Sequence, residues 1–435
     1  MAVRASRTLP AFVRQGLWRG LAWPILLAVG PSCLAAGGVF PPANPKSAEA
    51  RLEFAIDRWR RGDRVTALTE LDRLVAQYPN FRLGHLVRGD VLSSRVRGLA
   101  EIGDLKIAES EALDDLRAEA RMRLSNRPPV SGQVPRYLLK AAPSQRTAIV
   151  VDTSRSRVLV FDTSAAVPRM VGDFYASIGK NGARKEREGD KRTPIGVYRV
   201  TSRIPGAILP DLYGGGAFPL DYPNGRDRVQ GRTGSGIWIH GVPSSTYVRA
   251  PRASDGCVAM ANPDLDSLSA HILPGVTQVV IASAIEWVAP SALLAERDAF
   301  LPVLERWRMD WESGDTERYL SNYAHGFRTD GGDRGRWAAG KRRINARKAW
   351  ISLALSEVSV YRDPSAPGLL AVNFAQDYRS SNFSERIRKT QHWALEEGRW
   401  KIVYEAPVGA PARALPESYP GRVRAARPQP AGPRG

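Results

Sequence analysis

The spacing of apolar residues changes twice along this chain, and that change limits what the chain can fold into. Between about residues 48 and 127 apolar residues recur every three or four positions, as on a helix. From Thr147 they occur in short strand-like runs, and after Pro290 helical spacing returns before further strand-like runs. A helix-spaced segment cannot replace a strand, so we predict a multidomain α+β protein. The length of 435 residues agrees with about two to four domains.

The composition removes several classes of function. The chain has a net charge of +19 and only two cysteines. Two cysteines exclude a disulfide-rich scaffold, and the lack of CxxC and HExxH patterns excludes common zinc fingers and zincin proteases. We therefore predict no metal and no cofactor. The positive charge agrees with an anionic membrane or an acidic polymer as partner, and since no helix-turn-helix or RNA-binding signature accompanies it, we predict no nucleic-acid partner.

Residues 1–36 have the anatomy of a secretory signal peptide. An apolar stretch at residues 21–29 follows a basic segment without acids and is too short for the ~20 apolar residues of a membrane span. The basic residues are Arg4, Arg7, Arg14 and Arg19. We predict export to the periplasm, with an uncleaved anchor or a buried helix as alternatives, and membrane contact only through this segment. Cleavage would remove Cys33 and leave Cys257 as the remaining cysteine.

Residues 45–127 form the predicted helical module. Apolar residues fall on two successive helical faces, namely Leu52, Ala55, Ile56 and Trp59, then Ala67, Leu68, Leu71, Leu74 and Val75. This pattern resembles a tetratricopeptide hairpin, and a plain helical hairpin explains it equally well. One such unit cannot bury its apolar face alone, so we expect the module to pack on a neighbouring domain. It is also a candidate contact for partner proteins.

The strand-like region at residues 137–286 contains the residues with the most distinctive chemistry. A strand at 237–240 ends in His240, and Cys257 follows Gly256 in a short loop. A histidine beside a thiol can take its proton, and a glycine turn can aim backbone amides at a developing oxyanion, which is the minimum equipment for acyl transfer. A buried, inert cysteine explains the two residues taken alone equally simply.

Five segments of this region resemble, in order and spacing, the catalytic domain of L,D-transpeptidases. They are TAIVVDTSRSRVLVFD (147–162), GDKRTPIGVY (189–198), FPLDYPN (218–224), GRTGSGIWIHG (231–241) and SDGCVAM (254–260). The resemblance implies a mixed, β-sandwich-like fold with its site around the cysteine and the histidine.

The resemblance also implies a role for each site residue. Cys257 is the nucleophile, His240 is the general base and later the acid, and the backbone carbonyl of Gly241 orients the imidazole. The residues that shape the loop and supply the oxyanion hole are Ser254, Asp255 and Gly256, together with the Cys257 amide. The implied substrate is a peptidoglycan stem tetrapeptide, attacked at the carbonyl of its third residue with release of the terminal D-alanine.

The acceptor of the acyl group stays open. Water gives an L,D-carboxypeptidase, the amine of a second stem gives an L,D-transpeptidase, and release of proteins from stems is a third outcome. The chain has Asp255 where many members have His, and Ala259 where many have Arg. This variant is more similar to the branch that trims peptidoglycan, in which members with an appended nuclear-transport-factor-like domain resemble carboxypeptidases that shape helical cells.

Three further residues are candidates for substrate binding. Arg249 and Arg252 lie on the loop leading to Cys257 and could each hold a carboxylate. Tyr222 lies in the long loop after residue 206 and is a candidate lid residue, with packing in the core as the alternative. The charged loop at residues 180–192 could receive an anionic stem or be a solvated surface.

Residues 291–407 form the last predicted domain. Helices are expected at residues 293–311, 315–323 and 343–355, followed by strands, which gives an α+β domain. The pieces at 311–323 and 396–405 resemble the nuclear-transport-factor-like cone, whose interior could hold a glycan or peptide pocket. The tail at 408–435 has five arginines against one glutamate and is predicted to be disordered. The alternative function for the whole chain is a non-catalytic peptidoglycan-binding scaffold that recruits wall enzymes.

Overall fold

The computed structural model describes residues 47–96, 98, 102–104, 110–126 and 129–408. All of these residues belong to the same unit of the fold. The predicted signal peptide and residues 409–435 of the predicted tail lie outside the described residues. None of the helices that the structure describes combines the length and the apolar character needed to cross a bilayer.

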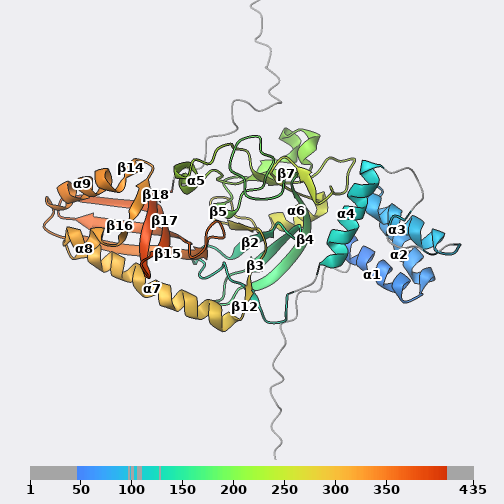
Figure 1. Cartoon of the computed structure of the whole chain (residues 1–435), viewed down its shortest axis with the longest axis horizontal. Helices are drawn as coiled ribbons and strands as arrows, with labels where there is room; N and C mark the ends of the chain where they lie inside the picture. Colours follow the sequence, from blue (N-terminus) through green and yellow to red (C-terminus); the bar gives the residue numbers. More distant parts are fainter. Residues whose placement is uncertain (1–46, 97, 99–101, 105–109, 127–128, 409–435) are drawn as a thin grey trace, which may run out of the picture. The chain divides into compact units, whose positions relative to one another are not determined.

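Four helices begin the described chain (Figure 1) and confirm the helical spacing of this region. They are α1 (Ala48–Arg60), α2 (Arg64–Gln77), α3 (Arg82–Ser93) and α4 (Glu111–Ser125). The side chains of Ser47 and Asp63 cap α1 and α2, because each accepts a hydrogen bond from a backbone amide of the first turn. The apolar faces meet in a core that includes Leu52, Leu71 and Val87. That these helices form a tetratricopeptide unit stays a prediction.

The helical module packs on the strand domain, as its uncovered apolar face predicts. The ring of Tyr247 enters the helical core, 4.5 Å from that of Phe81. The Asn80 side-chain amide donates a hydrogen bond of 3.0 Å to the carbonyl of Ser244. Buried Arg157 pairs with Glu49 of α1 at 2.6 Å. Residues 244–247, between His240 and Cys257 in the sequence, are therefore held by the helices.

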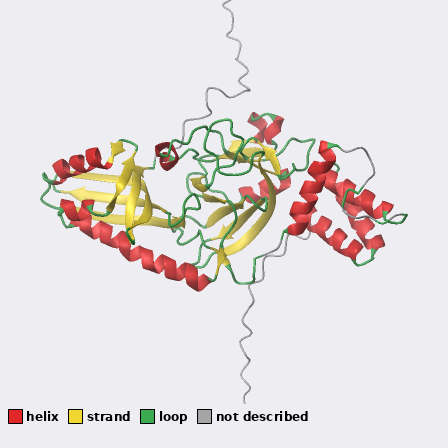
Figure 2. Cartoon of the chain, in the orientation of Figure 1, coloured by secondary structure: helices red, strands yellow, loops and turns green. Residues whose placement is uncertain are grey.

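The central domain is built on one mixed sheet of ten strands (Figure 2) in the order β5-β11-β2-β3-β4-β10-β8-β7-β6, with β9 paired to β4. The strands are β2 (Thr147–Asp152), β3 (Arg157–Asp162), β4 (Arg169–Gly179), β5 (Gly196–Arg199), β6 (Ile204–Pro205), β7 (Gly216–Pro219), β8 (Trp238–His240), β9 (Arg252–Ser254), β10 (Val258–Met260) and β11 (Gln278–Ala282). Between them lie α5 (Gly225–Val229), α6 (Asn262–Ser269) and two short 3-10 turns, Gly206–Ile208 and Asp211–Tyr213.

This topology confirms the mixed sheet, and β2 and β3 pair antiparallel as a hairpin within residues 147–162. The hydrogen-bonded path passes through nine of these strands, β9 pairs with β4 beside the path, and the sandwich-like arrangement stays a prediction. Buried apolar side chains form a cluster that includes Ile149, Ile239 and Val258. A short pair, β1 (Val134–Pro135) with β12 (Trp287–Val288), lies outside this sheet.

The last domain has helices first and strands afterwards, as predicted. Its elements are α7 (Pro290–Glu312), α8 (Thr316–Leu320), β13 (Tyr323–Thr329), β14 (Gly332–Asp333), α9 (Arg334–Asn345), β15 (Ile351–Arg362), β16 (Leu370–Ser380), β17 (Phe383–Glu396) and β18 (Arg399–Pro407). The sheet order is β14-β13-β18-β17-β16-β15, and the core contains Trp307, Trp311 and Trp393.

One predicted helix of this domain is wrong. Residues 343–355 were expected to be helical, but α9 ends at Asn345 and β15 begins at Ile351. Ile351 and Leu353 are buried and alternate with exposed Ser352 and Ala354, which is the period of a strand. Pairing with β16 therefore outweighs the helical propensity of this stretch.

Candidate active site

His240 and Cys257 lie on or directly before two neighbouring parallel strands. His240 ends β8, and Cys257 directly precedes β10. The strands pair with Val258 opposite Ile239 and Ala259 opposite His240. This register places Cys257 beside Trp238, whose amide donates a hydrogen bond of 3.4 Å to the Cys257 Sγ atom.

The thiol of Cys257 is held in its neutral form. Its Sγ donates a hydrogen bond of 3.3 Å to the carbonyl of Gly236. Burial raises the pKa of the thiol to about 11, against the smaller lowering effects of the Trp238 amide and the Arg249 charge. A thiol with this pKa is protonated at neutral pH, so it needs a base to become a nucleophile.

His240 is also neutral and has a fixed tautomer. It is 3% exposed, and its Nδ1 lies 2.6 Å from the carbonyl oxygen of Gly241. Because a carbonyl only accepts, Nδ1 carries the proton and Nε2 has the free lone pair. Burial lowers the pKa of the imidazole to about 4, the Gly241 hydrogen bond opposes this, and the Arg249 charge adds to it. The ring of Tyr213 packs edge-on against the imidazole at 5.0 Å.

The turn before the thiol is fixed by hydrogen bonds and by glycine geometry. The hydroxyl of buried Ser254 donates to the Cys257 carbonyl at 2.6 Å and accepts from the Gly256 amide at 3.2 Å. Gly256 has φ +124°, and a Cβ there would lie 2.8 Å from the carbonyl oxygen of Arg192. The Gly256 amide is thus engaged by Ser254, and an oxyanion role for it requires that it exchange this partner.

Asn262, at the start of α6, was not singled out from the sequence. Its Oδ1 accepts hydrogen bonds from the amides of Gly215 and Val242, at 3.0 and 3.2 Å, and its Nδ2 donates to the Val242 carbonyl at 2.9 Å. A Cβ at Gly241 would lie 2.1 Å from this Oδ1. Asn262 therefore fixes the backbone that orients His240. An asparagine directly before Pro263 at a helix start was the available signal.

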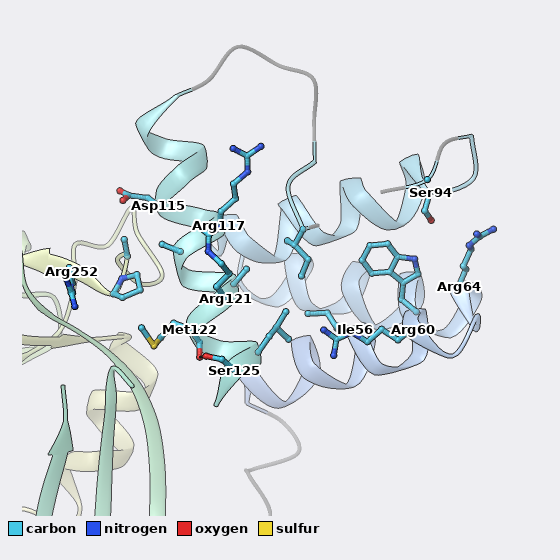
Figure 3. Close-up of a pocket in the computed structure, with 18 residues that line it drawn as sticks. Ile56, Arg60, Arg64, Ser94, Asp115, Arg117, Arg121, Met122, Ser125 and Arg252 are labelled. Atoms are coloured by element: carbon cyan, nitrogen blue, oxygen red, sulfur yellow. The ribbon is translucent and has the colours of Figure 1, made fainter. Parts of the chain in front are cut away.

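The two candidate arginines lie in different surroundings. The charge of Arg249 lowers the pKa of both His240 and Cys257, so its guanidinium is electrostatically coupled to both groups. Its Nη2 also donates to the Leu212 carbonyl at 3.4 Å. Arg252 begins β9, and its side chain lines a separate cavity formed with α1 and α4 (Figure 3).

The remaining candidates have mainly structural contacts. Tyr222 is 4% exposed, belongs to the core of the sheet domain and donates to the Thr233 carbonyl at 3.2 Å, which fits the packing alternative rather than a lid. Asp255 is exposed and lies 3.5 Å from Lys180. In the 180–192 loop, buried Lys185 binds Asp190 at 2.8 Å, so part of the charge stabilises the loop itself. In the described part of the chain no group of His, Cys, Asp and Glu side chains could hold a metal ion.

Comparisons with known proteins agree with this geometry. The chain is similar over 65% of its length, at 28% identity and a TM-score of 0.56, to the whole of Bd1075 from Bdellovibrio bacteriovorus. It shares its fold over 67% of its length, at 23% identity and a TM-score of 0.52, with all of Pgp2 from Campylobacter jejuni, described as a helical cell shape determining protein. No curated protein sequence matches the chain. Two family models match: residues 146–281 match the L,D-transpeptidase catalytic domain, and residues 299–406 match the Cds6 C-terminal NTF2-like domain.

Proposed function

We propose that this protein is a cysteine acyltransferase that acts on peptidoglycan stem tetrapeptides in the periplasm. The L,D-transpeptidase domain supports the substrate class. The observation that carries the chemistry is the neutral thiol of Cys257, which directly precedes the strand paired with β8, where buried His240 has a tautomer that leaves Nε2 free. Thiol and base are both in the protonation states that a general-base mechanism requires.

The reaction begins with attack of the Cys257 sulfur on the carbonyl of the third stem residue. As the C–S bond forms, the thiol proton moves to Nε2 of His240, and the resulting imidazolium is stabilised by the carbonyl of Gly241. Collapse of the tetrahedral intermediate breaks the peptide bond, and His240 returns the proton to the amine of the departing D-alanine. The amides of Asp255 and Cys257 stabilise the oxyanion, and the Gly256 amide joins them once it leaves the Ser254 hydroxyl.

The acyl group of the thioester is then transferred to an acceptor, and the Cys257 thiol is released. Water gives a shortened tripeptide stem and a carboxypeptidase, whereas the side-chain amine of a second stem gives a cross-link and a transpeptidase. Asp255 places a negative charge next to the thiol and raises its pKa slightly, against the lowering effect of Arg249. Arg249 is the proposed anchor for a substrate carboxylate because its charge is coupled to both reacting groups.

The test is incubation of the protein with a defined disaccharide-tetrapeptide, with products followed by mass, beside the Cys257→Ala variant. Loss of one D-alanine with gain of water identifies trimming, and dimers identify transpeptidation. Both products should vanish in Cys257→Ala. Absence of any product from a folded wild-type protein would contradict the enzyme proposal. If the wild type and Cys257→Ala then bind the muropeptide equally, the result would favour a wall-binding scaffold.

A pocket in the C-terminal domain supports wall binding as a second activity. It has a volume of about 470 Å³, and Lys341, Lys348 and Lys389 line it. Gln376 Oε1 and Trp311 Nε1, both buried and lining the pocket, have no hydrogen-bond partner among the described residues. Burial lowers the pKa of Lys341 to about 8. An anionic muropeptide would supply the missing partners. Shifts of tryptophan resonances on adding a muropeptide to Cys257→Ala, lost in Lys341→Gln, test this.

A further inference from the structure

A second cavity lies between the helical module and the segment that leads to Cys257 (Figure 3). Its volume is about 1180 Å³. Side chains of α1 and α4, including Trp59 and Met122, form one wall, and Ala250 to Arg252 form the other. At about 3.3 Å per residue, the stretch from Arg252 to Cys257 spans at most about 17 Å. The cavity therefore lies on the segment directly before the loop that holds the thiol.

The lining of this cavity is strongly basic. Five arginines and one aspartate line it, namely Arg60, Arg64, Arg117, Arg121 and Arg252, with Asp115. Arg64 and Arg252 are exposed and make no ion pair within the part of the chain that the structure describes. Guanidinium groups without a carboxylate partner bind carboxylates in a bidentate manner. Half-buried Trp59 and Met122 add an apolar surface on which a sugar ring or an aliphatic side chain can pack.

We propose that this cavity is a second peptidoglycan-binding site, which holds a stem adjacent to the one attacked by Cys257. The inference rests on the proposed substrate. Peptidoglycan carries carboxylates at repeated positions, so one polymer can reach both the basic cavity and the neighbouring thiol. The cavity volume exceeds that of a typical pocket for one small ligand. Binding at two points raises the effective concentration of the reacting stem, and the gain applies to polymeric wall but not to an isolated stem.

The test uses the full chain with Cys257→Ala and its co-sedimentation with purified sacculi at low and physiological salt. Arg64 and Arg82 form a matched pair, because each is exposed and is the first residue of a helix, α2 or α3, and only Arg64 lines the cavity. A glutamate is favourable at a helix N-terminus, so both charge reversals should fold. Arg64→Glu should weaken sacculus binding about fivefold, and Arg82→Glu should change it by less than about twofold.

Activity measurements separate this site from the thiol. With Cys257 restored, Arg64→Glu should release D-alanine from a soluble disaccharide-tetrapeptide at the wild-type rate and from sacculi several times more slowly. Equal sacculus binding by Arg64→Glu and wild type, or equal losses in Arg64→Glu and Arg82→Glu, would overturn the proposal. Absence of D-alanine release from both substrates by the wild type would instead refute the proposed function, while the sedimentation comparison would still report on the cavity.

Discussion

The Nδ1 atom of His240 lies 2.6 Å from the carbonyl oxygen of Gly241, the next residue in the chain. A backbone carbonyl orients the imidazole and fixes its tautomer as a carboxylate would, but it adds no negative charge. The buried imidazolium is therefore poorly compensated, and the pKa of His240 falls to about 4. The pair of Cys257 and His240 consequently rests as neutral thiol and neutral imidazole rather than as an ion pair.

Alkylation of Cys257 by iodoacetamide should become faster throughout the alkaline range. Since burial raises the pKa of this thiol to about 11, the thiolate fraction grows about tenfold per pH unit below that value. The logarithm of the rate should rise with a slope near one from about pH 7 to about pH 10. Mass measurement of the Cys257 peptide gives the rate, and a plateau between about pH 7 and about pH 8 would indicate a preformed thiolate–imidazolium pair instead.

The acid limb of kcat/KM should lie near the depressed pKa of His240. The imidazole acts as a base only when unprotonated, so activity should persist below the ordinary histidine pKa of about 6.5 and fall towards pH 4. Arg249→Gln should move this limb to higher pH, because removal of the nearby positive charge favours the imidazolium. Arg203→Gln serves as the control, because Arg203 is not among the charges that shift the pKa of His240 or Cys257. An acid limb near pH 6.5 in the wild type would contradict the buried, neutral base.

Asn262→Ala should lower kcat more than it raises KM. The substitution removes the acceptor of the Gly215 and Val242 amides, and two lost hydrogen bonds of this kind cost about 1–3 kcal/mol each where the groups stay buried. The loop that carries Gly241 would then no longer hold the imidazole at one angle. Steady-state kinetics with thermal unfolding checks this, and Ser267→Ala, on the same helix, is the control. An unchanged kcat would show that the loop keeps its geometry without Asn262.

Glu49→Gln should destabilise the contact between the helical module and the sheet domain. Burial alone would raise the pKa of Glu49, but Arg157 and Arg123 lower it to about 2. Removing one partner of a buried pair costs roughly 3 kcal/mol, and exposed Glu53 on the same helix gives the control Glu53→Gln.

The Glu49 carboxylate should make the stability of the protein depend on pH. Its folded pKa lies below the unfolded value of 4.5, so its stabilisation is complete above that pH and is lost as pH falls towards 2. Thermal unfolding across this range should show a smaller decline for Glu49→Gln than for the wild type. Equal declines would mean that other carboxylates carry the acid sensitivity.

Particular residues show how far sequence reasoning reaches. Local periodicity predicts strands from Thr147 onward, a strand ending at His240 and helices between about residues 48 and 127, and the structure has these elements. Residues 343–355 were misassigned because the strand period of β15 begins within a stretch of helix-forming residues, and only pairing with β16 decides between the two. The contacts of Asn262 could not be predicted, because its partners Gly215 and Val242 are distant in sequence.

By itself the sequence determined which residue types are available for chemistry: one histidine at a strand end, one cysteine after a glycine, and the segments of the L,D-transpeptidase domain. Tertiary structure decided what those residues can do. Register between β8 and β10 brings Cys257 next to Trp238, and burial moves the pKa values of thiol and imidazole in opposite directions. The fold also places Arg252 at a cavity lined by α1 and α4. The physical reason is that hydrogen-bond partners and desolvation depend on neighbours in space, and most of those neighbours are remote in the chain.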